Sequence, residues 1–242
     1  MEPLTTHLTL SLNASIDLHM HTTYSDGHWP AEQLINYLAD EGFDLVAVTD
    51  HDRVDKLAHI QALGAKRNLP VLAAVEMSTD WHGNMGDLLC YGFDPQANEL
   101  QALTEEVVRR QLDNTHAVYD KLRSQGYAFP RQDEILAKND GQLRLAGDNI
   151  ALLRAHGYAP DYFNALRMIT EAGYTSRKVE MAEAVEATHR SGGVSLIAHP
   201  GRREPGFTFY SPDLLDQVRA EIPLDGIEVY HPSHTPEMTA TY

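Results

Sequence analysis

Histidine and carboxylate side chains recur in this sequence where short apolar runs end. The first run ends in His19 and His21, with Asp26 shortly after, and later runs end in Glu76 and His199. Because alternate residues of a strand point to the same side, His19 and His21 can bind one cation together. Imidazole nitrogens combined with carboxylate oxygens suit zinc, manganese or iron rather than calcium. Glu76 has two oxygens and could bridge two ions, and paired ions can activate a water for attack on a phosphoryl or acyl group.

Short apolar runs alternate with helical segments in the first and last parts of the sequence. Near-continuous apolar runs are typical of parallel strands buried on both faces, and their alternation with helices predicts a parallel α/β sheet or barrel. We expect strands at residues 15–21, 43–51, 69–77, 86–93, 193–200 and 224–232. The carboxyl ends of the strands in an α/β barrel share one face. His51, which ends the second run, should therefore lie near His19, Glu76 and His199.

The middle of the sequence, residues 95–191, has helical patterns and few strand signals. It begins with a long amphipathic helix that ends at Gly126, and shorter helices follow. We interpret this segment as a mainly helical insertion that leads back into the barrel. Residues 1–94 and 192–242 would form the barrel domain itself.

Composition limits the classes of protein to consider. The chain has 242 residues, of which 43% are hydrophobic, and a formal net charge of −16. That charge argues against a basic surface for duplex nucleic acid, but a local positive site could still hold a small anionic substrate. No apolar run reaches the roughly 18 residues of a membrane span, and we expect neither a membrane partner nor a secretory signal. The single cysteine, Cys90, fits a reducing compartment, so we expect a cytoplasmic protein.

Motifs in a fixed order connect these residues to a known family. The sequence contains DLHMHTTYSDG at 17–27, VAVTDHD at 46–52, VEMS at 75–78 and LIAHPGR at 196–202. Together they resemble the PHP (polymerase and histidinol phosphatase) family of metal-dependent phosphoesterases. The resemblance implies a distorted (β/α)7 barrel that binds up to three metal ions. A helical insertion after the fourth strand resembles the branch that acts on nucleoside 3′,5′-bisphosphates and short oligonucleotides.

The same resemblance implies a set of metal ligands. His19, His21 and Glu76 would hold the first ion, and Glu76 with His199 would hold the second. Asp26 and His51 would hold the third ion. Glu76 and His199 are therefore the expected catalytic residues, acting through the bound metals and water.

The sequence departs from the family pattern in two places. The family commonly has a histidine where this chain has Asp87. An aspartate can bind the same metals, so Asp87 is a candidate ligand, and the alternative is a solvated carboxylate at a strand start. The family also ends its site with an Asp-x-His element, whereas this chain stops at Tyr242 without one. We therefore expect the C-terminal part of the barrel to be missing, and the alternative is a protein with a reduced site.

Residues near the motifs are candidates for supporting roles. Arg202 and Arg203 directly follow the His-Pro-Gly turn, and we expect at least one of them to bind substrate phosphate, because guanidinium pairs well with phosphate. Asp50 or Asp52, on either side of His51, could orient a ligand. His231 and His234 could reach the rim of the site, whereas we interpret His82 as a surface-loop residue.

These observations predict a metal-dependent phosphoesterase that hydrolyses a small phosphorylated metabolite or nucleotide with a metal-activated water. Two or three divalent ions are expected, with manganese, zinc and iron all compatible with the ligands. One alternative is an amidohydrolase-type metal hydrolase, which usually carries a metal-bridging lysine that these strand ends lack. The other is a catalytically degenerate metal-binding module. The sequence leaves the substrate, the metal and the oligomeric state open.

Overall fold

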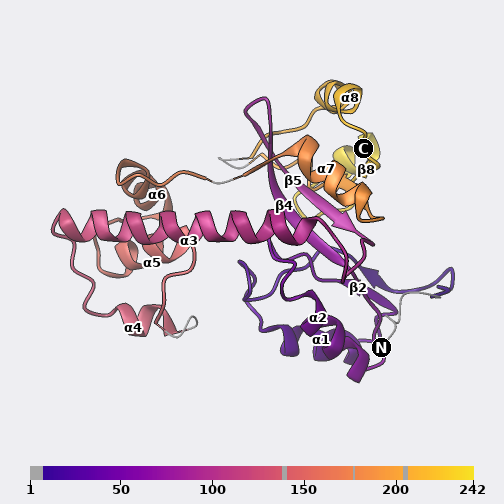
Figure 1. The fold of residues 1–242 in the computed structure, drawn as a ribbon, viewed down its shortest axis with the longest axis horizontal. Helices are drawn as coiled ribbons and strands as arrows, with labels where there is room; N and C mark the ends of the chain where they lie inside the picture. Colours follow the sequence, from indigo (N-terminus) through magenta and orange to yellow (C-terminus); the bar gives the residue numbers. More distant parts are fainter. Residues whose placement is uncertain (1–7, 138–140, 177, 204–206) are drawn as a thin grey trace. The chain divides into compact units, whose positions relative to one another are not determined.

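The computed structural model describes residues 8–137, 141–176, 178–203 and 207–242. The chain divides into two compact units, residues 1–105 with 178–242 and residues 106–177. The first unit is mixed α/β, as predicted, and carries both sheets (Figure 1). The second unit lies inside the segment 95–191 expected as an insertion, and the regular elements among its described residues are helices.

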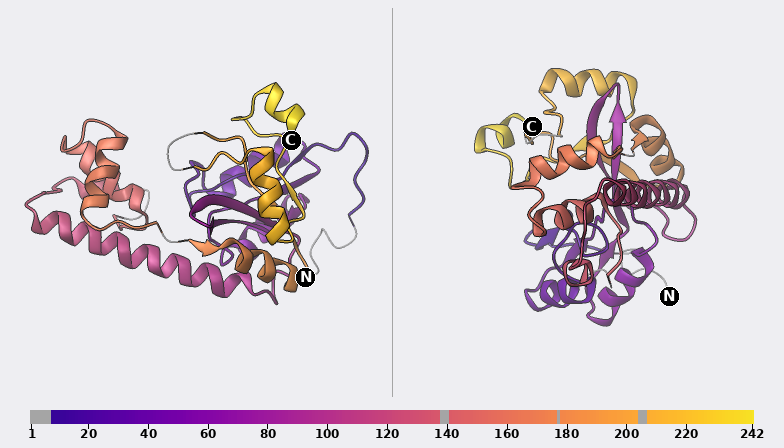
Figure 2. Two further views of the ribbon diagram at one scale, coloured as in Figure 1. Left: turned by 90° about the horizontal axis from the view of Figure 1, so that it is seen from above. Right: turned by 90° about the vertical axis from the view of Figure 1, so that its left-hand side faces the viewer.

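A small parallel sheet and two helices begin the first unit. Its strands are β1 (Ile16–Asp17), β2 (Leu45–Ala47) and β3 (Val71–Leu72), paired in that order. The helices α1 (Ala31–Asp40) and α2 (Leu57–Lys66) lie side by side (Figures 1 and 2). Ile35 and Leu38 of α1 and Ile60 of α2 share a buried core with Val46 of β2. This apolar layer holds the β1 and β2 strand ends in place.

The second sheet has the order β6-β4-β5-β7-β8. Helix α7 (Met181–Arg190) packs against β4, β5 and β7, and its buried side chains include Met181 and Val185. The strands are β4 (Ala74–Trp81), β5 (Asn84–Tyr91), β6 (Val179–Glu180), β7 (Val194–Ile197) and β8 (Gly226–Ile227).

The prediction that the strands all run parallel was wrong for β5. It pairs antiparallel with both neighbours, β4 and β7. The β4–β5 connection consists of His82 and Gly83, which both have positive φ, 51° and 82°. Such a two-residue loop closes an antiparallel hairpin, because two positive φ angles match the twist of the flanking strands. A parallel crossover needs a dozen or more residues, which this connection lacks.

The remaining helices complete the two units. In the first unit α8 (Pro212–Glu221) and α9 (Pro236–Thr241) each begin with a proline behind a capping side chain, Ser211 and Thr235. The helical unit has its own core, which includes Leu122, Phe129 and Leu152. Its helices are α4 (Gln132–Ile135), α5 (Ala146–Ala155), α6 (Tyr162–Glu171) and most of α3 (Leu100–Ser124).

The two sheets meet where the conspicuous polar residues lie. His51 forms a parallel bridge with Glu76 of β4, and the Asp52 N–H donates to the Glu76 carbonyl at 2.9 Å. The described strands form two sheets joined at this point and no closed ring. None of the described helices is long and apolar enough to cross a membrane.

Candidate metal centre

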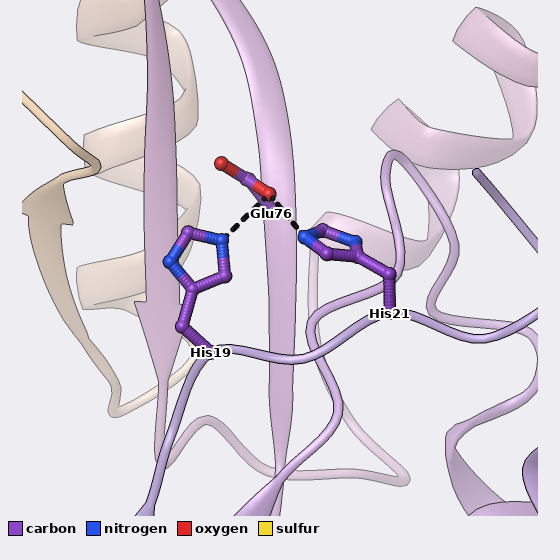
Figure 3. Close-up of side chains that lie close together, drawn as sticks. All are labelled: His19, His21 and Glu76. Atoms are coloured by element: carbon purple, nitrogen blue, oxygen red, sulfur yellow. Dashed lines mark hydrogen bonds and ion pairs between the residues drawn. The ribbon is translucent and has the colours of Figure 1, made fainter. Parts of the chain in front are cut away.

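Glu76 lies at the centre of a cluster of imidazoles. Its side chain is fully buried, on β4, and its Oε2 atom lies 3.0 Å from His19 Nε2 and 3.1 Å from His21 Nε2 (Figure 3). His51 Nε2 lies 3.5 Å from the same oxygen, whereas His199 Nε2 lies 3.1 Å from the other oxygen, Oε1. The structure thus brings together the histidines that follow β1, β2 and β7, as the sequence predicts for strand ends.

The two histidines after β1 are held by the backbone of the neighbouring strand. The Thr49 N–H donates to the Met20 carbonyl at 2.8 Å, which continues the β1–β2 pairing past the regular strands. Met20 lies between the histidines and packs against the apolar core of α1 and α2. His19 and His21 therefore face the opposite side, toward Glu76.

Asp26 lies at the exposed side of the cluster. Its carboxylate oxygens are 3.6 Å from His21 Nδ1 and 3.8 Å from His51 Nε2, and its side chain is 65% exposed. The rings of His21 and His51 stack with centroids 4.8 Å apart. These three residues form a second group of donor atoms, all within 4.8 Å of one another.

The buried carboxylate of Asp50 positions the loop that carries Asp26. Asp50 accepts hydrogen bonds from the Thr22 N–H at 2.7 Å, the Thr22 hydroxyl at 2.8 Å and the Ser25 hydroxyl at 2.8 Å. Gly27 closes the loop, since a Cβ there would lie 2.2 Å from the His21 carbonyl oxygen. The sequence analysis expected either Asp50 or Asp52 to orient a ligand. These contacts favour Asp50, which holds the loop of Asp26 in place.

Asp87 lies within the cluster rather than at a solvated strand start. It is 4% exposed in the middle of β5, opposite Ser78 on β4, which places it diagonally beside Glu76 on one face of the hairpin. Its Oδ2 atom is 3.6 Å from His199 Nε2. Burial, followed by the charge of Glu76, raises the pKa of Asp87. A buried carboxylate beside another carboxylate is costly unless a cation compensates it.

The carboxylates make this cluster a strong binding site for positive charge. Burial opposes a charge on His19, yet its hydrogen bonds with Glu228 and Glu76 raise its pKa to about 10. Burial likewise opposes a charge on His51, but Glu76 and Asp87 raise its pKa to about 9. Burial would raise the pKa of Glu76, but the nearby His51 and the hydrogen-bonded imidazoles hold it well below its usual range.

The donor set fits divalent transition-metal ions. A neutral imidazole has one N–H and one nitrogen with a lone pair, and a carboxylate offers lone pairs only. Where the lone-pair nitrogens face the carboxylate oxygens at these short separations, the two repel each other unless positive charge lies between them. The buried Nδ1 atoms of His21 and His51 also lack a hydrogen-bond partner in the described structure. Nitrogen and carboxylate ligands together are the usual environment of zinc, manganese and iron.

Comparison with known proteins decides the family. The model of the PHP domain family matches residues 17–186. The chain belongs to the PHP domain family. It is 30% identical over 234 residues to a 3′,5′-nucleoside bisphosphate phosphatase of Chromobacterium violaceum, which covers 92% of this chain and 79% of that protein. A phosphoribosyl 1,2-cyclic phosphate 1,2-diphosphodiesterase of Eggerthella lenta is 28% identical, over 90% of this chain and 84% of that protein.

Solved structures agree with this fold. A structure from Bifidobacterium adolescentis, assigned as a metal-dependent phosphoesterase, matches with a TM-score of 0.77 and 23% identity, over 94% of this chain and 81% of that one. An amidohydrolase structure from Chromobacterium violaceum, with bound sulfate and no metal, matches with a TM-score of 0.73 and 25% identity. The match covers 94% of this chain and 81% of that one. The predicted family, fold class and enzyme class are confirmed: this PHP domain is a metal-dependent phosphoesterase.

The structure separates the two arginines of this PHP domain that follow His199. Arg202 is half-buried, stacks on the Phe207 ring with its guanidinium carbon 3.6 Å from the centroid, and lies near enough to Asp87 that its charge lowers the pKa of that carboxyl. Arg203 is exposed and stacks on Phe209 at 3.9 Å. Arg202 therefore lies beside the candidate metal centre, whereas Arg203 packs on a different ring.

His231 and His234 have different positions. The His231 ring lies 5.1 Å from that of His199, and burial lowers the pKa of His231 to about 4. His234 instead supports the turn after His199, because its Nε2 accepts the Gly201 N–H at 3.1 Å and its Nδ1 donates to the Val229 carbonyl at 2.9 Å. His82 lies in the hairpin loop and pairs with Glu221 at 2.8 Å, in agreement with a surface-loop role.

Glu228 is the site residue that the sequence analysis missed. It directly follows β8, and its carboxylate bonds to His19 Nδ1 at 2.9 Å and to the His199 N–H at 2.7 Å. In the sequence it stands in an apolar stretch, IEVYH, far from every PHP motif quoted above. The available signal was its position at a strand end, which it shares with the predicted ligands.

Proposed function

We propose that this PHP domain hydrolyses the phosphate ester of a small nucleotide, with nucleoside 3′,5′-bisphosphates as the substrate class and two or three divalent transition-metal ions at the Glu76 cluster. The observation that carries this proposal is the convergence of four imidazoles on the two oxygens of one buried carboxylate. Glu76, and no lysine, occupies the centre of the cluster, which favours the phosphoesterase over the amidohydrolase alternative.

The distances support an assignment of ligands to separate ions. Oε2 of Glu76 faces His19 and His21, which supports a first ion held by these three residues. Oε1 faces His199, and Asp87 lies close to His199, which supports a second ion between those groups. Asp26 and His51, with His21 nearby, would hold a third. Manganese, zinc and iron all suit this set of donors.

Bound divalent ions would supply Lewis acidity and a water of lowered pKa at this position. The chain supplies the geometry. Glu76 links two ligand groups through separate oxygens, so that two charges can be held close together. Asp50 fixes the loop of Asp26, and Arg202 offers a guanidinium beside Asp87 for the oxygens of the transferred phosphate. The substrate thus meets positive charge locally on a chain with a net charge of −16.

Arg202 and Arg203 form a matched pair for testing phosphate recognition. Replacing Arg202 by alanine should lower kcat/KM by roughly 10–150-fold, about 1.5–3 kcal/mol, because one charge-assisted contact to phosphate is lost. Arg203→Ala removes the same charge from an exposed position over Phe209 and should change kcat/KM less than about threefold. Steady-state kinetics on one phosphorylated substrate measures kcat/KM for both variants. If kcat/KM falls equally in the two variants, or does not fall in Arg202→Ala, the placement of Arg202 on the phosphate is contradicted.

The substrate class rests on similarity to relatives. The Chromobacterium violaceum relative is named for nucleoside 3′,5′-bisphosphates, and the Eggerthella lenta relative for a cyclic phosphate of phosphoribose. Phosphate release should be measured with manganese over a panel of nucleoside 3′,5′-bisphosphates, short oligonucleotides, cyclic phosphates and sugar phosphates. Nucleoside 3′,5′-bisphosphates should give the highest kcat/KM, and a higher value for another group would replace this substrate. The buried, single Cys90 supports a reducing compartment such as the cytoplasm.

A further inference from the structure

One carboxylate, that of Glu228, contacts two proposed metal ligands from different parts of the chain. Its Oε1 lies 2.9 Å from His19 Nδ1, and its Oε2 accepts the His199 backbone N–H at 2.7 Å. Glu228 itself is fixed, because its N–H donates to the Ile197 carbonyl at 2.8 Å and its side chain is 12% exposed. The two strand ends that carry His19 and His199 are therefore joined through one residue.

The contact with His19 decides which ring nitrogen carries the proton. A carboxylate accepts hydrogen bonds and donates none, and Oε1 of Glu228 is the oxygen that faces His19 Nδ1 at 2.9 Å. His19 Nδ1 must then donate. In the neutral ring this leaves the lone pair on Nε2, the atom that faces Glu76 at 3.0 Å. A histidine prepared in this way presents Nε2 to a metal ion.

The contact with His199 holds an uncommon backbone conformation. His199 has φ of +29°, in the left-handed region that non-glycine residues rarely adopt. Its N–H points to Glu228 Oε2, and its ring reaches Glu76 Oε1 at 3.1 Å. Without this anchor the residue would be free to relax to ordinary backbone angles, and the ring would move away from Glu76.

We propose that Glu228 is a positioning residue that orients ligands of two different metal ions, fixing the tautomer of His19 and the backbone of His199. This inference rests on the ligand roles proposed above for His19 and His199. It predicts that Glu228 affects the affinity of both ions although it binds neither. Glutamine cannot replace it, because the amide has one acceptor and one donor end. Either orientation sets an NH2 group against a donor, at His19 Nδ1 or at the His199 N–H.

Asp225 provides a matched control at the other end of β8. Its Oδ2 accepts the Ser195 backbone N–H of β7 at 2.7 Å and lies 2.8 Å from His189 Nε2. Asp225 also contacts one imidazole and one backbone N–H, but it does so through a single oxygen, and it touches no proposed ligand. Asp225→Asn and Glu228→Gln both replace a carboxylate by the amide of the same shape, but the amide oxygen of Asn can take the place of Oδ2, whereas Gln loses one of its two acceptors.

The test is cobalt binding by metal-free protein. Co²⁺ is titrated into wild type, Glu228→Gln and Asp225→Asn, followed by visible absorption and by competition with a chelator, and thermal unfolding reports the fold of each variant. Glu228→Gln should weaken Co²⁺ binding roughly 10–100-fold at two sites and alter the absorption bands. Asp225→Asn should keep the wild-type affinities and spectrum. If Glu228→Gln does not fold, Glu228→Asp keeps the charge with a shorter reach and should lose affinity in the same direction.

The possible outcomes separate this inference from the proposed function. Wild-type affinities and spectrum in Glu228→Gln would overturn the positioning role while leaving the metal centre intact. Loss of one ion, with the others bound as tightly as in wild type, would make Glu228 a direct ligand and also overturn it. Wild-type protein that binds no Co²⁺ would overturn the proposed metal centre itself.

Discussion

Replacing Glu76 by glutamine is expected to lower kcat/KM at least on the order of 10²–10³-fold, about 3–4 kcal/mol of transition-state stabilisation. The physical reason is that Glu76 is the shared partner of His19, His21, His51 and His199 and is fully buried. Glutamine keeps the shape but removes the negative charge that, in the proposed site, holds cations at the cluster. Elemental analysis of the same preparation should show fewer ions for each chain than in wild type.

Asp80→Asn is the matched control for this substitution. Asp80 lies on the same strand, β4, but its carboxylate accepts the Gly83 N–H at 2.8 Å in the hairpin turn. The control should change kcat/KM less than about threefold, while thermal unfolding checks that both variants fold. Wild-type activity and metal content in Glu76→Gln would contradict the central position of Glu76 in the metal centre.

Removal of the Asp87 carboxylate should also abolish most activity. Asp87→Ala is expected to lower kcat/KM by roughly 10²-fold, because an oxygen beside His199 would be lost from the group proposed to hold the second ion. Asp87→His restores a ligand of the kind common in this family. We expect it to retain bound metal and to shift preference among competing ions toward zinc, since imidazole is a softer donor than carboxylate.

Measurement of metal content after competition between Mn²⁺ and Zn²⁺ checks this prediction. The fraction of bound metal that is zinc should be higher in Asp87→His than in wild type. The total metal content should be lower in Asp87→Ala than in wild type. If Asp87→Ala keeps the wild-type metal content and kcat/KM, Asp87 is a buried structural carboxylate and not a ligand.

The sequence was sufficient to predict which residues come together at the centre of the candidate site, for a physical reason. Ligands at strand ends converge because those ends share one face, so the strand pattern alone was enough to group His19, His51 and His199. The alternation of His19 and His21 in a strand even predicted that both rings reach the same side, and both contact Glu76 Oε2.

The antiparallel course of β5 was not predicted, although its signal was present. Gly83 marks the turn, and the connection between the strands is too short for a parallel crossover. Treating the fourth strand as parallel placed Asp87 at a strand start, where solvation was a real alternative. The hairpin instead sets Asp87 opposite Ser78 and buries it beside Glu76.

Glu228 shows what sequence patterns leave out. Its partners His19 and His199 lie far away along the chain, and the contact depends on how β8 joins the sheet beside β7. A glutamate in an apolar strand end has no spacing that distinguishes it from a solvated residue. Roles that arise from long-range pairing, such as that of Glu228 or the separation of Arg202 from Arg203, require the folded structure.

The most direct test of the whole account is metal removal and reconstitution of the wild-type chain. Metal content and phosphate release from a nucleoside 3′,5′-bisphosphate are measured before chelation, after chelation and after addition of Mn²⁺. We expect at least two ions bound to each active chain, loss of phosphate release when they are removed, and recovery when Mn²⁺ is bound again. Phosphate release that continues unchanged in metal-free protein, or reconstituted protein that holds no ion, would contradict the account.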